Sequence, residues 1–354
     1  MSLRRGVLLR AAAVAVGLAL VGGTAHAQNL AFSLFERYLD SLRQQAGIPG
    51  LAALVSQNGL TEWERGFGQR SIERNLPVLS DTPFPVGGLT QAFSSTLALQ
   101  CVDGGQATLD DAVSRWVPSS APDLTLGLLL SHGIPGDGFR YDAARFTQLT
   151  PMIEDCFERP IANVVATEIL DRLAMRASVP GTDLMLQGND ARAAFDAQVL
   201  SRYEGVLDQV ATAYRLDRAG RPVRVEQLPA GLNASTGLVT SVRDLGRFAS
   251  ALDDDVLMSQ ATRTLAWSSR VSAAGKPTPA GLGWFVQSYR GEPLVWQFGS
   301  LNDGYSSLLL MLPRRRLVFA LLANTDGLSA PFALANGDAT VSPFAELFLR
   351  TFLP

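Results

Sequence analysis

Lysine and histidine are scarce in this 354-residue sequence, and their scarcity limits its chemistry. Lys276 is the only lysine, so 29 of the 30 basic residues are arginine, and the two histidines are His26 and His132. A mechanism that needs an amine base must therefore use Lys276. Two histidines and two cysteines are few soft ligands for a zinc site. We expect neither a metal site nor a cofactor.

An excess of positive charge and long apolar runs are also missing from most of the chain. The formal net charge is −3, which disfavours a basic surface for nucleic acid. After residue 27, no apolar run reaches the roughly 18 residues that span a bilayer. We therefore expect no nucleic-acid partner and no membrane span. The 47% content of hydrophobic residues is typical of a folded protein with a large core.

Residues 1–27 have the pattern of a signal peptide. Three arginines precede a short apolar stretch at residues 11–21, and Ala25-His26-Ala27 fits a cleavage site of small residues. We therefore predict export to the periplasm or secretion. Cleavage after Ala27 would leave His132 as the only imidazole of the mature chain.

Cys101 and Cys156 are the only cysteines, and the sequence leaves their state open. A bridge between them would close a loop of about 55 residues and would stabilise the fold by roughly 4 kcal/mol. Each cysteine also lies in an apolar helical pattern, where a free thiol packs as a small hydrophobic group.

Strand patterns occur near both ends of the chain. Asn58-Gly59 between two apolar runs predicts a β-hairpin. Four further apolar or alternating runs lie near the C-terminus, at residues 281–288, 294–298, 305–312 and 317–324. The simplest packing joins both ends of the chain in one antiparallel sheet.

Helical patterns fill the middle of the chain. They are clearest at residues 88–103, 146–156, 161–173 and 244–252. The sequence thus predicts an α/β (α+β) protein. We assign residues 28–86 and 262–354 to an α/β domain with the antiparallel sheet, and residues 87–261 to a mainly helical domain.

Five segments, in order along the chain, look like sequence stretches of one known family. They are Phe84-Pro85-Val86-Gly87, Leu128-Leu129-Leu130-Ser131-His132-Gly133, Leu173-Ala174-Met175, Thr236-Gly237-Leu238-Val239 and Gly304-Tyr305-Ser306-Ser307. Together they resemble the serine β-lactamase and penicillin-recognising family, closest to its class C β-lactamase, DD-peptidase and esterase branch. The resemblance implies a β-lactamase/transpeptidase-like fold, with an antiparallel sheet flanked by helices and a helical domain.

The resemblance assigns the family's first catalytic motif, S-x-x-K, to residues 88–91. In that motif the Lys lies on the same helix face as the nucleophilic Ser and takes its proton. Here the two positions are Gly88 and Gln91, so the motif offers no hydroxyl and no amine. No displaced copy exists, because Ala273 stands three residues before Lys276.

The other two motifs of the family are changed as well. Its Y-x-N becomes Tyr141-Asp142-Ala143, which keeps the Tyr and loses the Asn. Its K-T-G or H-x-G becomes Phe298-Gly299-Ser300, where a phenyl ring replaces the cation or imidazole. The family-equivalent site positions are therefore Gly88, Gln91, Tyr141, Ala143, Phe298 and Ser300, with no intact catalytic set among them.

These changes predict a non-catalytic homologue that acts as a binding or interaction module in the cell envelope. Its ligand would be a small molecule or a peptidoglycan fragment in the cleft between the two domains. The sequence favours no particular oligomeric state.

The alternative is an active serine hydrolase, of β-lactamase, DD-peptidase or esterase type, that uses a displaced nucleophile. Ser94 and Ser95 lie too far along the helix for this role, whereas Ser300 lies closer to the expected site. A Ser-His-Asp set would need His132, which the resemblance places in a structural turn. From the sequence alone, Gly88→Ser with Gln91→Lys is expected to restore slow acylation, because it returns both the nucleophile and its base. The fold should tolerate the new Ser, which is favoured at a helix start.

Overall fold

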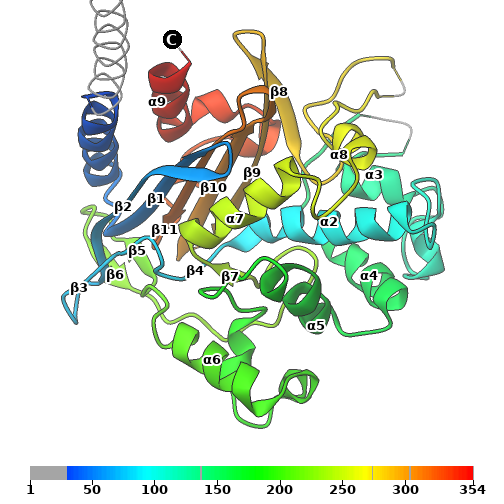
Figure 1. The fold of residues 1–354 in the computed structure, drawn as a ribbon, viewed down its shortest axis with the longest axis horizontal. Coiled ribbons are helices and arrows are strands. Elements are labelled where there is room, and N and C mark those ends of the chain that lie inside the picture. The colour runs from blue at the N-terminus through cyan, green and yellow to red at the C-terminus, as the bar shows by residue number, and fades with distance from the viewer. Residues whose placement is uncertain (1–29, 136–137, 273, 303, 354) are drawn as a thin grey trace, which may run out of the picture.

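A seven-stranded antiparallel sheet joins the two ends of the chain (Figure 1). The computed structural model describes residues 30–135, 138–272, 274–302 and 304–353, so the predicted signal peptide lies outside the described residues. The strands follow the order β3-β2-β1-β11-β10-β9-β8 across the sheet. Their bounds are β1 Gly50–Gln57, β2 Leu60–Ser71, β3 Leu76–Pro77, β8 Phe285–Tyr289, β9 Glu292–Leu301, β10 Tyr305–Leu312 and β11 Leu317–Ala323.

The predicted hairpin and the C-terminal strands are confirmed. Asn58 and Gly59 join β1 to β2 with φ angles of 52° and 78°, the left-handed backbone that this turn requires. The central strand β11 is apolar throughout because both of its faces are buried. Val318, Ala320 and Leu322 face one core, and the alternate residues face the other.

Helices cover both faces of the sheet. The helix at residues 30–45 and α9 (Pro343–Phe352) pack on one face, where Phe319 of β11 lies between Phe35 and Phe348 at ring distances of 5.6 and 4.5 Å. On the other face, α7 (Val242–Asp253) contacts β1 and β11. Although α7 falls in the range assigned to the helical domain, it therefore packs directly on the sheet.

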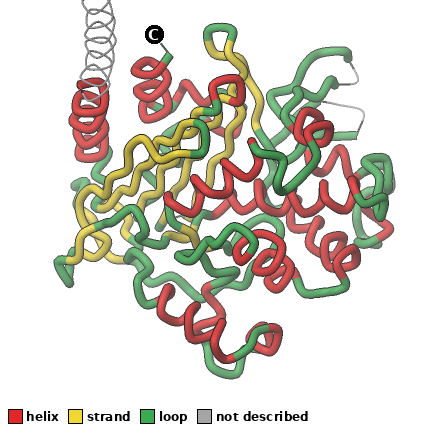
Figure 2. The backbone as a smooth tube through the Cα atoms, in the orientation of Figure 1, coloured by secondary structure: helices red, strands yellow, loops and turns green. Residues whose placement is uncertain are grey.

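The middle of the chain is mostly helix and loop (Figure 2). Its α-helices are α2 Thr90–Asp103, α3 Leu126–Leu130, α4 Leu149–Phe157, α5 Ile161–Val165, α6 Ala197–Leu207 and α8 Gln260–Ala266. A π-helical segment, Ala166–Asp171, continues α5. Two short strand pairs also occur, β4 (Phe84–Pro85) with β7 (Val239–Thr240) and β5 (Tyr214–Leu216) with β6 (Pro222–Arg224). No described helix is long and apolar enough to cross a membrane.

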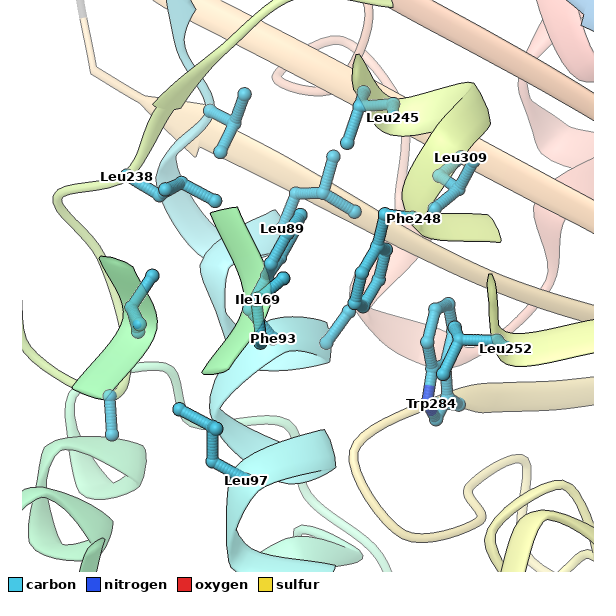
Figure 3. Close-up of a cluster of buried hydrophobic side chains, with 14 of the residues drawn as sticks. Leu89, Phe93, Leu97, Ile169, Leu238, Leu245, Phe248, Leu252, Trp284 and Leu309 are labelled. Atoms are coloured by element: carbon cyan, nitrogen blue, oxygen red, sulfur yellow. The ribbon is translucent and has the colours of Figure 1, made fainter. Parts of the chain in front are cut away.

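Helix α2 lies in the centre of the larger core (Figure 3). Phe93 of α2 stacks on Phe248 of α7, with 3.8 Å between the ring centroids. Leu89, which immediately precedes α2, is fully buried in the same cluster. The start of α2 is therefore held in place by packing on several sides.

A disulfide links α2 to α4. Cys101 and Cys156 are bonded, and their Cα atoms lie 6.2 Å apart. The sequence left this bond open because each cysteine sits in its own helical pattern. Only the packing of α4 against α2 brings the two thiols together.

The predicted strand at residues 281–288 begins later than expected. Gly283 has a φ of 80°, and a β-carbon there would lie 1.8 Å from the Ser95 hydroxyl oxygen. The chain therefore turns closely around α2 at Gly283, and β8 starts only at Phe285.

Candidate functional site

Gly88 lies where α2 meets the sheet. It belongs to a 3₁₀ turn, Gly87–Leu89, that leads into α2 and packs against β9. Strand β8 pairs with β9 only as far as Trp296, so Phe298, Gly299 and Ser300 pair with β10 alone. Gly299 permits a close approach here, because a β-carbon at that position would lie 1.8 Å from the Val86 carbonyl oxygen. The structure thus brings the first and third motif positions side by side.

The hydroxyl of Tyr141 occupies the space beside Gly88 where a side chain would begin. A β-carbon on Gly88 would lie 2.9 Å from the Tyr141 hydroxyl oxygen and 3.2 Å from the Phe298 carbonyl oxygen. The first of these distances is shorter than β-carbon contacts in folded proteins. The site is therefore shaped around a glycine.

Gln91 is fully buried and makes two side-chain hydrogen bonds. Its Nε2 donates to the Tyr141 hydroxyl oxygen at 3.2 Å, and its Oε1 lies 3.0 Å from His132 Nε2. The backbone N–H of Asp142 donates to His132 Nδ1 at 3.2 Å. Because Nδ1 is an acceptor, the neutral ring carries its proton on Nε2 and donates it to Gln91. Gln91, His132 and the Tyr141-Asp142 dipeptide therefore form a closed polar network.

The His132 and Tyr141 side chains of this network are uncharged at neutral pH. Burial lowers the pKa of His132 to about 3, and the nearby Arg145 guanidinium acts in the same direction. Burial also raises the pKa of Tyr141 to about 12. Neither side chain can therefore act as a general base with a pKa near the working pH.

An aromatic cluster lies against the network from the sheet side. The Tyr141 ring is 5.3 Å from Phe298 and 5.6 Å from Phe285, measured between centroids. Phe285 stacks on Trp296 at 4.4 Å. Phe298 thus packs inside the smaller core, where the family motif would place a cation or an imidazole.

The remaining predicted positions contribute little polar chemistry. Ala143 supplies a methyl group, and its carbonyl accepts a hydrogen bond of 2.5 Å from the Ser235 hydroxyl. Ser300 is half-buried beside Gly87, and its hydroxyl makes no hydrogen bond to any described residue. Lys276 lies in an exposed turn. The described ranges hold no cluster of His, Cys, Asp or Glu that could bind a metal.

The sequence identified most of these residues but missed how they pair. His132 was assigned to a structural turn, and its φ of 51° agrees with a turn. Its bond to Gln91 has no signal in the sequence, because the two residues are 41 positions apart. Phe285 packs on Tyr141 and Phe298. It could not be singled out from the sequence, because it is one apolar residue within a strand pattern.

We predict that His132 makes the stability of the fold depend on pH. An unfolded His has a pKa near 6.5, and the folded value of about 3 is lower, so protons favour the unfolded state between these values. This stabilisation is complete above pH 6.5. It should fall by up to about 1.4 kcal/mol per pH unit as the pH drops towards 3.

Urea unfolding of the wild type and of His132→Gln from pH 7 to pH 4 measures this effect. The Gln amide can still donate to Gln91 but does not titrate. The stability difference between the two proteins should shrink as the pH falls. A constant difference would show that the pKa of His132 is the same in the folded and the unfolded chain.

Comparison with known proteins agrees with this architecture. The family model described as Beta-lactamase matches residues 35–340. Penicillin-binding protein 4 of Amycolatopsis lactamdurans is 28% identical over 348 residues, which cover 88% of this chain and 87% of that protein. A beta-lactamase of Pseudomonas fluorescens is 24% identical over 295 residues, covering 78% and 79% of the two chains.

Solved structures share the fold at low sequence identity. The octameric penicillin-binding protein homologue from Pyrococcus abyssi aligns with a TM-score of 0.72 at 20% identity, covering 90% of this chain and 77% of that one. The D-amino acid amidase from Ochrobactrum anthropi aligns with a TM-score of 0.71 at 18% identity, covering 92% and 98%. With the family model matching most of the sequence, these alignments show that the chain belongs to the beta-lactamase family.

Proposed function

We propose that this chain is a non-catalytic member of its family that is exported and acts as a binding or interaction module in the cell envelope. The observation that carries the proposal is the Tyr141 hydroxyl, which lies 2.9 Å from the position of a Gly88 β-carbon. The space of a nucleophilic side chain is thus filled by another residue. A side chain at position 88 would therefore require the Tyr141 hydroxyl or the start of α2 to move.

The polar groups around Gly88 support the same conclusion. Both ends of the Gln91 amide are used by His132 and Tyr141, and neither neighbour ionises near neutral pH. A general base needs a free lone pair and a pKa close to the working pH. Loss of a catalytic serine alone typically lowers a hydrolase rate by about six orders of magnitude.

The ligand that we propose for the family site is a small molecule or a peptidoglycan fragment. Phe139 and Tyr141 are half-buried at the edge of the aromatic cluster and offer apolar contact area. Ser300, two residues after Phe298 on β9, offers a hydroxyl that makes no hydrogen bond within the described structure. Such a surface fits binding better than proton transfer.

Covalent labelling tests the proposal. Purified protein is treated with a fluorescent penicillin and with a fluorophosphonate, and any adduct is located by mass spectrometry. We expect no adduct, and no hydrolysis of a chromogenic cephalosporin or a p-nitrophenyl ester. An active serine β-lactamase serves as the positive control, and Ser300→Ala serves as the matched variant. A stoichiometric adduct on Ser300 that this variant loses would instead establish a serine hydrolase with a displaced nucleophile.

A further inference from the structure

A cavity of about 520 Å³ lies at the other end of β9 from the family site. Pro293 and Val295 of β9 line it, whereas Phe298 and Ser300 lie further along the same strand. Its other walls come from the end of α7, from α8 and from the turn between β10 and β11. The volume is within the range of small-molecule sites in proteins.

Two residues of opposite charge, Asp253 and Arg314, line this cavity and form no ion pair within 4 Å in the described structure. Among the described residues, the Asp253 carboxylate makes no hydrogen bond and no ion pair within 4 Å. Arg314 lies in the turn after β10 and has no carboxylate partner among the described residues. Its one hydrogen bond there is from Nη1 to the Gly291 carbonyl oxygen, at 3.4 Å. Unpaired charges of opposite sign that share a cavity complement a ligand that carries both signs.

The neighbouring charges are already paired. Arg263 forms an ion pair with Asp255 at 2.7 Å, and Arg316 forms one with Asp254. Arg263 comes from α8 and Arg316 from the turn after β10, and both line the cavity. Their partners immediately follow α7. Asp253 and Arg314 therefore remain available to a ligand.

The rest of the lining is largely apolar. Trp267 of the α8 end, with Pro293, Pro313 and Val295, provides flat and aliphatic surface. The Arg263 guanidinium lies over the Trp267 ring, 5.5 Å from its centroid. The Trp267 Nε1–H is buried and has no hydrogen-bond partner in the described structure, so one donor is also unused.

We propose that this cavity binds a small zwitterion, an amino acid or a short peptide, with its ammonium group against Asp253 and its carboxylate against Arg314. The apolar wall around Trp267 would contact an aliphatic or aromatic side chain of that ligand. This site is separate from the family site and does not depend on the function proposed for it.

Binding at this cavity should weaken in acid. Burial raises the pKa of Asp253 to about 6, although Arg316 and Arg263 act in the opposite direction and Asp254 and Asp255 act with the burial. Below pH 6 the carboxyl group of the free protein is neutral and loses its charge interaction with an ammonium group. The dissociation constant should therefore rise between pH 7 and pH 5.

Calorimetric titration of the full chain with alanyl-leucine tests the proposal, using both the L,L and the D,D forms. The N-acetylated dipeptide lacks the ammonium group, and the dipeptide amide lacks the carboxylate. Each modification should weaken binding by about tenfold or more, since a hydrogen bond to a charged group is lost.

Two substitutions assign the two contacts. Asp253→Asn should remove the preference for the free dipeptide over its N-acetyl form, and Arg314→Gln should remove the preference over its amide. Arg315→Gln is the matched control in the same turn, because Arg315 pairs with Glu292 at 3.2 Å and does not line the cavity. Asp208→Asn on the exposed end of α6 is the control for the acidic position.

Three outcomes would overturn the proposal. They are no heat of binding at millimolar dipeptide, equal affinity for all three ligand forms, and unchanged preferences in both variants. An N-acetyl dipeptide that binds as tightly as the free one would identify a plain carboxylate site instead. If Asp253→Asn fails to fold, Arg314→Gln still tests the proposal, because Arg314 is exposed and its substitution should leave the fold intact. Penicillin labelling of the family site involves none of these residues, so the two proposals fail independently.

Discussion

Gly88→Ser combined with Gln91→Lys should lower the free energy of unfolding by about 3–5 kcal/mol and should not produce a protein that penicillin acylates. The β-carbon that replaces a hydrogen of Gly88 would lie 2.9 Å from the Tyr141 hydroxyl oxygen, so the Tyr141 ring or the start of α2 would have to move. Both groups are held by the surrounding aromatic and apolar packing. The Gly88→Ser substitution should therefore destabilise the fold.

The Gln91→Lys substitution adds the larger part of this cost. Gln91 is fully buried and accepts a hydrogen bond from His132, whereas an ammonium group has donors only. The introduced lysine would leave the His132 Nε2–H without its acceptor and would bury a charge without an anionic partner. Burial would also depress the pKa of the new amine. From the sequence alone we expected slow acylation; the observed packing around Gly88 and Gln91 reverses that expectation.

Urea unfolding and fluorescent-penicillin labelling measure the two parts of this prediction. Gly205→Ser and Gln198→Lys on α6 are the matched controls, since a β-carbon at Gly205 would meet no atom within 4 Å and Gln198 is exposed. Adding Tyr141→Phe should reduce the penalty of Gly88→Ser, because the clashing hydroxyl is then absent. Wild-type stability together with acylation would show that the site kept the shape of an active enzyme.

Replacing both cysteines, Cys101→Ala with Cys156→Ala, should lower the free energy of unfolding by about 4 kcal/mol. The sequence separation of 55 residues sets this value, because the bond restricts the unfolded chain by an amount that grows with the loop it closes. The effect is about a quarter or more of the stability of a typical domain, which is about 5–15 kcal/mol.

Reductant provides the control for the disulfide prediction. Urea unfolding with and without dithiothreitol should show a large loss of stability for the wild type and none for the double variant. A wild type that is indifferent to reductant would contradict the bridge. The variant should still fail to react with penicillin, because the disulfide lies at the far end of α2 from Gln91.

The sheet was predictable because its sequence signals are local. Asn58-Gly59 specifies a tight turn, and β11 is apolar at every position because helices cover both faces of the sheet. The start of β8 was predicted wrongly, since the sharp turn at Gly283 arises from the approach of Ser95 on α2. That approach is a tertiary contact, and no short segment of sequence encodes it.

The candidate site was predictable in its positions and unpredictable in its contacts. The family resemblance located Gly88, Gln91 and Tyr141, and the structure brings these three residues together. It did not reveal that His132 is the hydrogen-bond partner of Gln91, or that the Tyr141 hydroxyl fills the space beside Gly88. Both facts depend on how the loop before α4 folds over α2. Whether Cys101 and Cys156 are bonded could not be decided from the sequence either, because the packing of α4 against α2 brings them together.

The pairing of β1 with β11 has a consequence for the time course of folding. The Gly50 N–H donates to Asn324 Oδ1, which lies 274 positions later, and β1 occupies the middle of the sheet. The sheet cannot close until nearly the whole chain has been made, which takes roughly 20–70 s at about 5–20 residues per second. During that interval the apolar β1 has a strand partner on one side only. Contacts between such distant segments also slow the search that follows. A newly made chain should therefore stay unfolded, and open to chaperones or proteases, until its last strand arrives.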